Sequence, residues 1–288
     1  MILVTGASGN VGGEVLRQLV AARQPVRAMY RSQAEAAKAP KGVATAIADF
    51  EDPASLERAL EGIEKVYLVC APIPDLVKLE TNAIEASKKK KIRHLVLNSA
   101  MGAGTFDASF PRWHRQVEQT LEKSGLAYTI VRPNSFMQNI VNFYAPTIRT
   151  EGRFYAAMKN ARNSFIDVRD IAAVIVKLLT TPGHEGKAYE LNGPEAVSYS
   201  ELAARISKIA GRPVQYVDLP PQELGRGMLS AGMPQWMVDA LLELQRYYTE
   251  GRGGEVDDVV KKMIGREPIH LGQFLRENVE AFKEAKSA

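Results

Sequence analysis

Residues 2–12 read Ile-Leu-Val-Thr-Gly-Ala-Ser-Gly-Asn-Val-Gly, and this stretch decides the fold. The apolar run 2–5 predicts a short buried strand, because it is brief, rich in β-branched and aliphatic residues and followed at once by glycine. An apolar face with helical spacing begins inside the same stretch, at Val11, Val15, Leu16, Leu19 and Val20. A strand, a glycine-rich turn and an amphipathic helix therefore open the chain.

The three glycines of this turn predict the chemistry that it serves. Gly6 permits the tight turn after the strand, Gly9 lets a pyrophosphate approach the backbone, and Gly12 lets the helix pack closely on the sheet. The helix N-terminus then offers unpaired N–H groups and a positive dipole end to phosphates. We expect a dinucleotide to bind here, at Gly6, Ser8, Gly9, Asn10, Val11 and Gly12.

Strand and helix patterns alternate along the first 130 residues. Apolar, β-rich runs lie at 2–5, 26–30, 43–47, 66–70, 94–98 and 128–131, with helical patterns between them. One of these helices is expected to start at Asp52-Pro53, with the aspartate as N-cap and proline at the first helical position. This alternation predicts an α/β fold with a doubly wound parallel sheet.

The rhythm changes after Pro133. We expect a helix over 134–148, an extended piece at 165–168, an N-cap at Asp170 for the apolar helix 171–179, and a strand at 189–191. Ser198 and Glu201 have the spacing of a capping box. We place a domain boundary near residue 193: a dinucleotide-binding domain over 1–193 and a smaller, mostly helical lobe over 194–288, with 134–150 contributing to the substrate side.

Composition excludes several classes of protein. The chain has 288 residues, 45% hydrophobic and 24% charged, which is ordinary for a globular protein and argues against disorder. A net charge of +4 is small for this length and gives little reason to expect nucleic acid. The single cysteine, Cys70, excludes an internal disulfide, no metal site is expected, and no apolar run could span a membrane. Because no signal-like segment opens the chain, we expect a cytoplasmic protein.

The ends of the second and third strands bear on the cofactor. Tyr30-Arg31-Ser32 lacks the acid that commonly holds the ribose 2′-hydroxyl of NAD, whereas a guanidinium and a hydroxyl suit a 2′-phosphate. Arg31 and Ser32 thus favour NADPH over NADH, the alternative being an ordinary surface arginine. Asp49 and Phe50 are expected to border the adenine, or Asp49 merely ends its strand.

Together these motifs resemble the NmrA-like family of atypical short-chain dehydrogenases/reductases, and the resemblance runs along essentially the whole chain. It rests on the segments 5–12, 30–31, 49–50, 98–99, 118–125, 131–134, 165–171 and 193–194. The family includes NAD(P)H-dependent quinone, azo-dye and triarylmethane-dye reductases, and also redox sensors that bind the dinucleotide without turnover. It implies further cofactor contacts at Pro133 and Asn134, and substrate contacts at Phe136 and Asn139.

The resemblance also shows that the usual proton donor is missing. Typical short-chain dehydrogenases use Ser, Tyr and Lys, and counting back from Glu118 puts Phe110 at the tyrosine position and His114 at the lysine position. Ser99 fills the serine position. We therefore expect Ser99 and His114 to act in catalysis, His114 as proton donor or nicotinamide-ribose contact, although it could be a plain surface histidine. Tyr155 and Lys159 have the right spacing, but they lie in a segment that does not read as a helix.

A site without that tyrosine favours conjugated acceptors, which spread the charge that an isolated ketone would localise on one oxygen. We expect an NADPH-dependent reductase of flat quinone-like or dye-like compounds; the alternative is a non-catalytic NADP(H) sensor that acts through a protein partner. The backbone at Ala71 and Pro72 is expected to border the cofactor. Within the Met- and aromatic-rich stretch 228–248, Trp236 is the expected substrate contact. The oligomeric state is expected to be monomer or homodimer.

Overall fold

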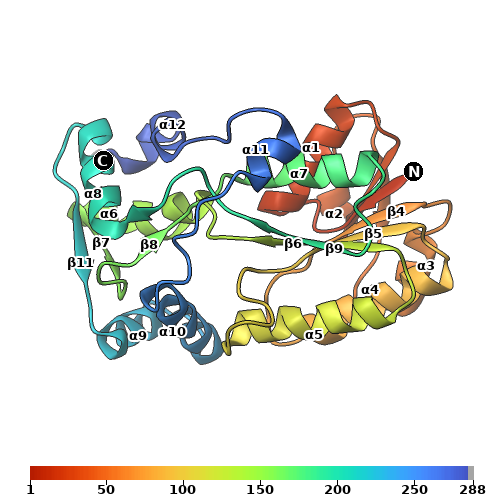
Figure 1. Cartoon of the computed structure of the whole chain (residues 1–288), viewed down its shortest axis with the longest axis horizontal. Coiled ribbons are helices and arrows are strands. Elements are labelled where there is room, and N and C mark those ends of the chain that lie inside the picture. Colours follow the sequence, from red (N-terminus) through yellow and green to blue (C-terminus); the bar gives the residue numbers. More distant parts are fainter. Residues whose placement is uncertain (285–288) are drawn as a thin grey trace. The chain divides into compact units, whose positions relative to one another are not determined.

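The computed structural model describes residues 1–284, and the chain divides into two compact units (Figure 1). The first comprises residues 1–133 and 168–191, and the second comprises 134–167 and the chain from 192 onward. The expected boundary near 193 lies beside one of these crossings. The structural units differ from that division because the chain leaves the first unit at Asn134 and returns to it at Val168.

The first unit is built on a seven-stranded sheet in which every neighbouring pair is parallel. Its order is β3-β2-β1-β4-β5-β6-β9, which is the doubly wound arrangement predicted from the alternating pattern. The strands are β1 (Ile2–Val4), β2 (Val26–Tyr30), β3 (Ala44–Ile47), β4 (Lys65–Leu68), β5 (His94–Asn98), β6 (Tyr128–Pro133) and β9 (Lys187–Leu191). The order reverses between β1 and β4, and ligands of such sheets bind outside the carboxyl ends of the strands at that point.

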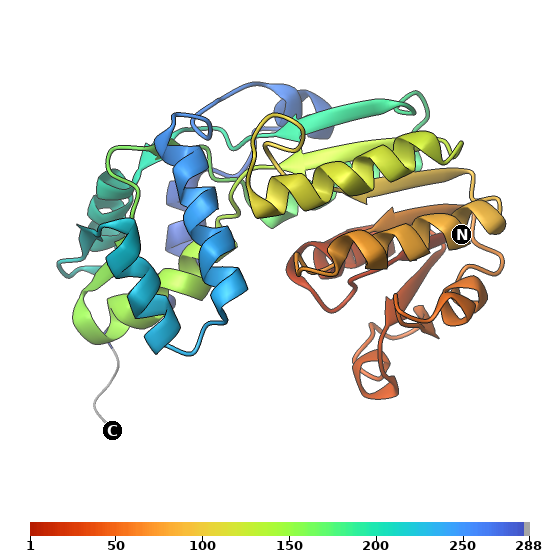
Figure 2. The same ribbon diagram turned by 90° about the horizontal axis from the view of Figure 1, so that it is seen from below.

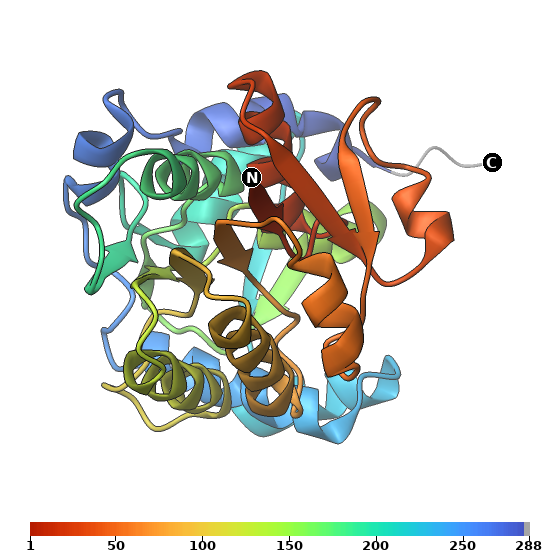
Figure 3. The same cartoon turned by 90° about the vertical axis from the view of Figure 1, so that its right-hand side faces the viewer.

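Helices cover both faces of this sheet. Figure 3 shows α1 and α7 on one face and α4 and α5 on the other, and in Figure 2 α4 and α5 run side by side in front of the strands. The helices are α1 (Asn10–Ala21), α2 (Gln33–Ala36), α3 (Pro53–Ala59), α4 (Leu76–Lys89), α5 (Ser109–Lys123) and α7 (Val168–Thr180). The apolar face predicted for α1 is buried at Val11, Val15, Leu16 and Leu19.

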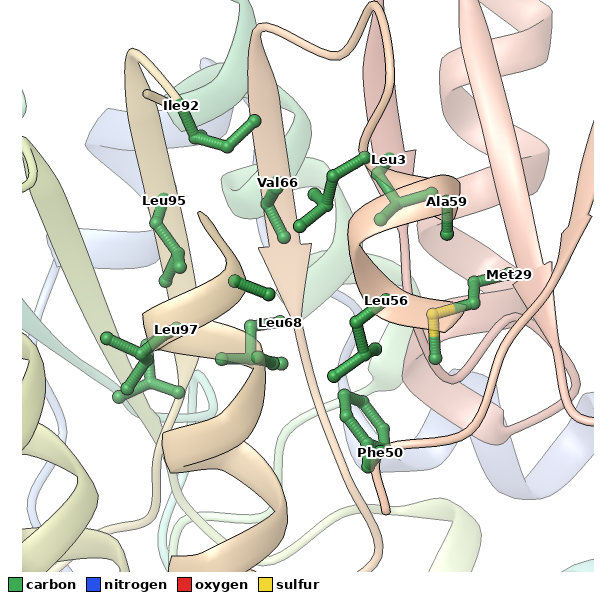
Figure 4. Packing of buried hydrophobic residues seen from close by; sticks show 14 of the residues in the cluster. Leu3, Met29, Phe50, Leu56, Ala59, Val66, Leu68, Ile92, Leu95 and Leu97 are labelled. Carbon is green, nitrogen blue, oxygen red and sulfur yellow. The ribbon is translucent and has the colours of Figure 1, made fainter. Parts of the chain in front are cut away.

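The core of the first unit lies between the sheet and helices α3 and α4. Leu3, Val66, Leu68, Leu95 and Leu97 project from β1, β4 and β5 (Figure 4). Leu56 and Ala59 of α3 close over them, and the ring of Phe50 lies beside Leu56. Each such aliphatic side chain contributes about 1.5–3 kcal/mol when fully buried, so this layer holds the strand ends that carry the site in place.

Two predicted caps are present in the structure. The Asp52 carboxylate accepts a hydrogen bond from the N–H of Ala54 at the start of α3, with Pro53 in the first turn. Ser198 and Glu201 form a reciprocal capping box at the start of α8 (Tyr199–Ala210). In both helices, side-chain oxygens at the positions predicted from the sequence accept hydrogen bonds from backbone N–H groups at the helix N-terminus.

The second unit is mostly helical, with two small two-stranded sheets. In one, β7 (Arg153–Ala156) pairs in parallel with β11 (Gln215–Asp218); in the other, β8 (Arg162–Asn163) pairs antiparallel with β10 (Val197–Ser198). Its helices are η1 (Ile140–Tyr144), α6 (Ala145–Glu151), α8, α9 (Pro221–Ser230), α10 (Gln235–Thr249), α11 (Val259–Ile264), α12 (Leu271–Glu277) and η2 (Val279–Phe282). Figure 2 shows α9 and α10 packed against each other.

One local prediction was wrong at its start, and a second was wrong altogether. Residues 134–137 are not helical, because Phe136 pairs with Ile166 and the Met137 N–H donates to the Ile166 carbonyl at 2.9 Å, so the expected helix begins only at Gln138. A π-helical turn at 140–144 then leads into α6. Asp170 is not an N-cap, because α7 already begins at Val168 and Asp170 lies buried in its first turn.

Candidate functional site

The turn after β1 is shaped by backbone atoms. Gly6 has a φ of +56°, and a Cβ there would lie 2.7 Å from Val69 Cγ1. A Cβ on Gly12 would lie 2.2 Å from the Gly6 carbonyl oxygen, so α1 starts directly against the turn. The Gly9 N–H closes the turn by donating to that same carbonyl at 2.9 Å. Gly6 and Gly12 therefore have the local reasons for glycine that the sequence indicated, and the approach of a pyrophosphate at Gly9 stays a prediction.

The start of α1 fits an anionic diphosphate. Gly9 is its N-cap, no side chain caps it, and no acidic residue lies in its first turn. The first N–H groups of a helix have no intrahelical acceptor, so they and the helix dipole are available to phosphate oxygens. Ser8, Gly9 and Asn10 are exposed, whereas the Val11 side chain is buried and can offer only its N–H.

The ends of β2 and β3 differ in what they expose. Arg31 and Ser32 are both exposed after β2, and the Ser32 hydroxyl accepts from the Glu35 N–H at 3.2 Å as N-cap of α2. After β3, Asp49 is exposed, and its Oδ1 accepts from the Glu51 N–H at 2.9 Å. Phe50 is only 9% exposed and belongs to the core, so little of its ring is open to a base.

The segment after β4 brings an inert thiol close to the sheet edge. Ala71 and Pro72 are exposed, while Cys70 is half-buried. Burial raises the pKa of the Cys70 thiol to about 12, and the nearby carboxyl of Glu80 adds to the rise. Glu80 itself is completely buried, and burial raises its own pKa well above the ordinary range. With a pKa of about 12, the Cys70 thiol stays protonated at neutral pH and is a poor nucleophile.

Ser99 lies at the end of β5 in a buried ionic cluster. Its hydroxyl donates to Glu118 Oε1 at 2.6 Å, and Arg132 Nε donates to the same oxygen at 2.8 Å. Arg115 and Arg132 also donate to Glu118 Oε2, at 3.0 and 2.8 Å. Burial alone would raise the pKa of Glu118, but the hydrogen bonds from Arg132 and Ser99 and the arginine charges lower it. The Ser99 proton is therefore committed to a carboxylate that ties α5 to β5 and β6.

His114 is buried on α5, one turn before Glu118, and is 6% exposed. Burial lowers its pKa to about 4, although the Glu118 carboxylate opposes the shift. Its Nδ1 is buried without a hydrogen-bond partner among the described residues. At neutral pH the ring is therefore a neutral imidazole. The surface-histidine alternative does not describe this side chain.

The neighbours of His114 on α5 supply no acid. Phe110, one turn earlier, makes an edge-to-face contact with Trp113 at 5.6 Å between ring centroids. Tyr155 lies half-buried on the strand β7 in the second unit, and its hydroxyl donates to Glu151 Oε2 at 2.5 Å. The prediction that Tyr155 is not on a catalytic helix is confirmed.

In the second unit, the side chain of Asn134 is fully engaged. Its Nδ2 donates to Asn192 Oδ1 at 2.9 Å and to the Gly253 carbonyl at 3.0 Å, and its Oδ1 accepts from the Ser135 N–H at 2.8 Å. Asn192 in turn donates to Asp257 at 2.8 Å. Any contact of Asn134 with a cofactor would have to use its backbone. Pro133, the last residue of β6, is buried, and its carbonyl accepts from the Met101 N–H at 3.2 Å.

The three expected substrate residues lie in the second unit and are half-buried. Phe136 and Asn139 belong to the segment before η1, and Trp236 lies in the first turn of α10. Ser135 hydroxyl, in the same segment, is 2.8 Å from the hydroxyl of Tyr248, whose pKa burial raises to about 12. This hydroxyl pair was not predicted, because Tyr248 reads in the sequence as an ordinary apolar position of a helix.

Two features are absent from residues 1–284. No helix of this part of the chain is long and apolar enough to cross a membrane. No group of three or more His, Cys, Asp or Glu side chains within it is arranged to hold a metal ion.

Comparison with known proteins supplies the remaining evidence. Residues 6–182 match the NAD(P)H-binding family. The NAD(P)H azoreductase of Xenophilus azovorans is 39% identical to this chain over 287 residues, which cover 99% of this chain and 100% of the relative. The match therefore extends through both units.

Two solved structures agree with this chain over nearly their whole length. The NADPH-dependent quinone oxidoreductase of Escherichia coli, complexed with NADPH, is 29% identical with a TM-score of 0.88 and covers 97% of this chain and 99% of its own. The Citrobacter sp. triphenylmethane reductase, complexed with NADP(H), is 21% identical with a TM-score of 0.87 and covers 96% and 99%. The second likeness shows the fold alone.

Proposed function

Since the chain belongs to the NAD(P)H-binding family, we propose that it is an NADPH-dependent reductase that transfers hydride to electron-poor conjugated acceptors of the quinone, azo or triarylmethane type. The class of enzyme, an oxidoreductase using NAD(P)H, follows from the family and from the full-length similarity to an azoreductase and a quinone oxidoreductase. The choice of acceptor rests on the chemistry of the residues around α5.

The residues that hold the cofactor in this proposal lie at the carboxyl edge of the sheet. N–H groups at the start of α1 bind the diphosphate, with Ser8 and Asn10 exposed beside them. Arg31 faces the ribose phosphate, and Asp49 and the backbone at Ala71 and Pro72 border the adenine end. When bound, NADPH supplies the hydride. The protein supplies the positions of the reacting groups.

One observation carries the acceptor class: Phe110 and His114 leave α5 without a hydroxyl acid or a cation. A phenyl ring cannot donate a proton, and an imidazole with a pKa of about 4 is unprotonated at neutral pH. An isolated ketone would need such a donor as its oxygen gains charge. A quinone, an azo bond or a triarylmethane cation spreads that charge, so orientation and proximity suffice and solvent completes protonation.

The second unit provides the contacts to the acceptor in this proposal. Phe136 and Trp236 offer aromatic faces to a flat ring, and the Asn139 amide orients a polar substituent. All three are half-buried, which leaves part of each side chain accessible. We further propose that the enzyme works in a reducing cytoplasm as a monomer or homodimer. Light scattering on the purified protein would decide between the two assemblies.

The test is NADPH consumption by the purified protein with a quinone, an azo dye and a triarylmethane dye in parallel. NADPH binding is measured by fluorescence in the same sample, and a saturated ketone is the matched control acceptor. We expect turnover with at least one conjugated acceptor and none with the ketone. Comparable turnover of the ketone would contradict the acceptor class. Tight NADPH binding without any turnover would replace the reductase by a dinucleotide sensor.

A further inference from the structure

Two opposite charges lie at the end of β2, where the sequence showed only one. The acid missing from residues 30–32 is supplied by Glu35 of α2. Its Oε2 accepts from the Arg31 N–H at 3.1 Å, and its own N–H donates to the Ser32 hydroxyl at 3.2 Å. The carboxylate is therefore bound to the backbone of the residue whose guanidinium suits a 2′-phosphate, and the Glu35 backbone is anchored at Ser32.

The two charges act oppositely on the two forms of the cofactor. A 2′-phosphate carries up to two negative charges, so it is attracted by Arg31 and repelled by a carboxylate held beside the Arg31 backbone. A ribose 2′-hydroxyl is neutral and donates a hydrogen bond, which a carboxylate accepts well. Arg31 thus favours NADPH, and Glu35 favours NADH.

Glu35 is held in place beside Arg31. Its side chain is half-buried, and two hydrogen bonds, one through its carboxylate and one through its backbone N–H, fix the residue at the start of a helix of four residues. The charge of Glu35 also reaches Tyr30, whose pKa is raised first by burial and then by this carboxylate. Tyr30, Arg31 and Ser32 all lie on the side of the sheet edge where the ribose of a dinucleotide would lie.

We propose that Glu35 is a specificity-determining residue that opposes Arg31 and gives the protein dual use of NADPH and NADH. This inference rests on the proposed function, because it concerns the cofactor of that same site. It predicts a protein that prefers NADPH weakly instead of strictly.

The test is the substitution Glu35→Gln with direct titration of NADPH and NADH by fluorescence. Glutamine keeps both hydrogen bonds, since its amide oxygen accepts from Arg31 and its backbone N–H still donates to Ser32. We expect NADPH to bind about three- to ten-fold tighter and NADH about two- to five-fold weaker. Because both changes are electrostatic, the gain for NADPH shrinks when salt is raised from about 0.01 M to 1 M.

Glu85→Gln is the matched control, because Glu85 is exposed on α4 and forms none of the contacts at the end of β2. It should change neither affinity. If the unaltered protein binds both cofactors and Glu35→Gln leaves their ratio unchanged, or changes it independently of salt, the inference is wrong while the proposed function stands. If the unaltered protein binds neither, the proposed function fails and the inference with it.

Discussion

The turns after β1 and β2 are neighbours on the same sheet edge, but backbone atoms form the surface of the first and side chains form that of the second. The first is backbone: Gly6, Gly9 and Gly12 pack so closely that a Cβ on Gly12 would lie 2.2 Å from a carbonyl oxygen. The second is exposed side chain, with Arg31, Ser32 and Glu35 held by hydrogen bonds near 3 Å. A backbone cradle tolerates no substitution, whereas an exposed charge pair can change without disturbing the fold.

In the proposed function, the two turns bind different parts of the dinucleotide. Diphosphate is common to every dinucleotide cofactor, so the part that receives it can be rigid. The 2′ position distinguishes NADPH from NADH, and here side chains decide. In the other half of the sheet, the Glu118 cluster is buried like the first turn and charged like the second, and it links β5, β6 and α5.

The largest effect is expected from Gly12→Val, which would disrupt the turn after β1 that is built from backbone atoms. The new side chain meets the Gly6 carbonyl, so we expect the free energy of unfolding to fall by about 3 kcal/mol and NADPH affinity to fall by at least ~100-fold. Urea unfolding and fluorescence titration measure the two. Gly227→Ala is the control, because a Cβ there meets nothing within 4 Å. Normal binding by Gly12→Val would show that this turn does not receive the cofactor.

Next in size is Glu118→Gln, which tests the buried charges. Arg132 and Ser99 would lose an ionised partner whose side chain is fully buried, so we expect a loss of about 3 kcal/mol in unfolding free energy. Glu122→Gln is the control. Glu122 also pairs with Arg115 but is 32% exposed, so its loss should stay below about 1 kcal/mol.

The Glu118 effect has a defined pH dependence. The folded pKa is lower than the unfolded value of about 4.3, so the ionised carboxylate stabilises the protein above that pH and loses its contribution as pH falls through the folded pKa. The difference between wild type and Glu118→Gln should therefore be constant from pH 6 to 8, with wild type approaching the variant in acid. A difference that grows in acid would reverse the assigned sign.

The substitution Arg31→Asp tests the role of the exposed side chain in the turn after β2. Removing the guanidinium and adding a carboxylate should weaken NADPH about 30- to 100-fold, while NADH changes by less than about five-fold. Unfolding by urea should be unaffected, since Arg31 is exposed. Equal losses for the two cofactors would remove Arg31 from the 2′-phosphate position.

The smallest effect is expected from Tyr155→Phe, outside both turns. The hydroxyl is exposed on β7 and donates to Glu151, so turnover with a quinone should stay within about two-fold of wild type. Steady-state kinetics measure it. A loss of turnover beyond ten-fold would return Tyr155 to the catalytic group and overturn the role given to α5.

The sheet and its glycine turn could be predicted because their requirements are local. Gly6 needs a positive φ, Gly12 needs the absence of a Cβ, and the alternation of strands and helices needs only short-range periodicity. The helix expected over 134–148 begins four residues later than predicted, at Gln138, for the opposite reason. Phe136 pairs with Ile166, which is 30 residues away, and such a partner leaves no trace in the periodicity of either segment.

The candidate site was predictable in its positions and less so in its chemistry. The sequence indicated Ser99, His114 and Asn134 as site residues. It did not indicate that the Ser99 hydroxyl donates to Glu118 or that burial lowers the pKa of His114. Nor did it indicate that the Asn134 amide donates to Asn192 and to the Gly253 carbonyl. Glu35 was missed because a carboxylate reaches Arg31 only through the turn of α2. These facts depend on contacts across the fold, which a single sequence does not state.

The excursion of residues 134–167 out of the first unit has a consequence for synthesis of the chain. Strand β9 and helix α7, which packs beside α1, come from residues 168–191. After β6 has been synthesised, the ribosome still has to synthesise residues 134–167 before strand β9 and helix α7 can form. At ~5–20 residues per second this interval lasts several seconds. During it the surface of α1 that α7 contacts in the folded protein lacks that partner.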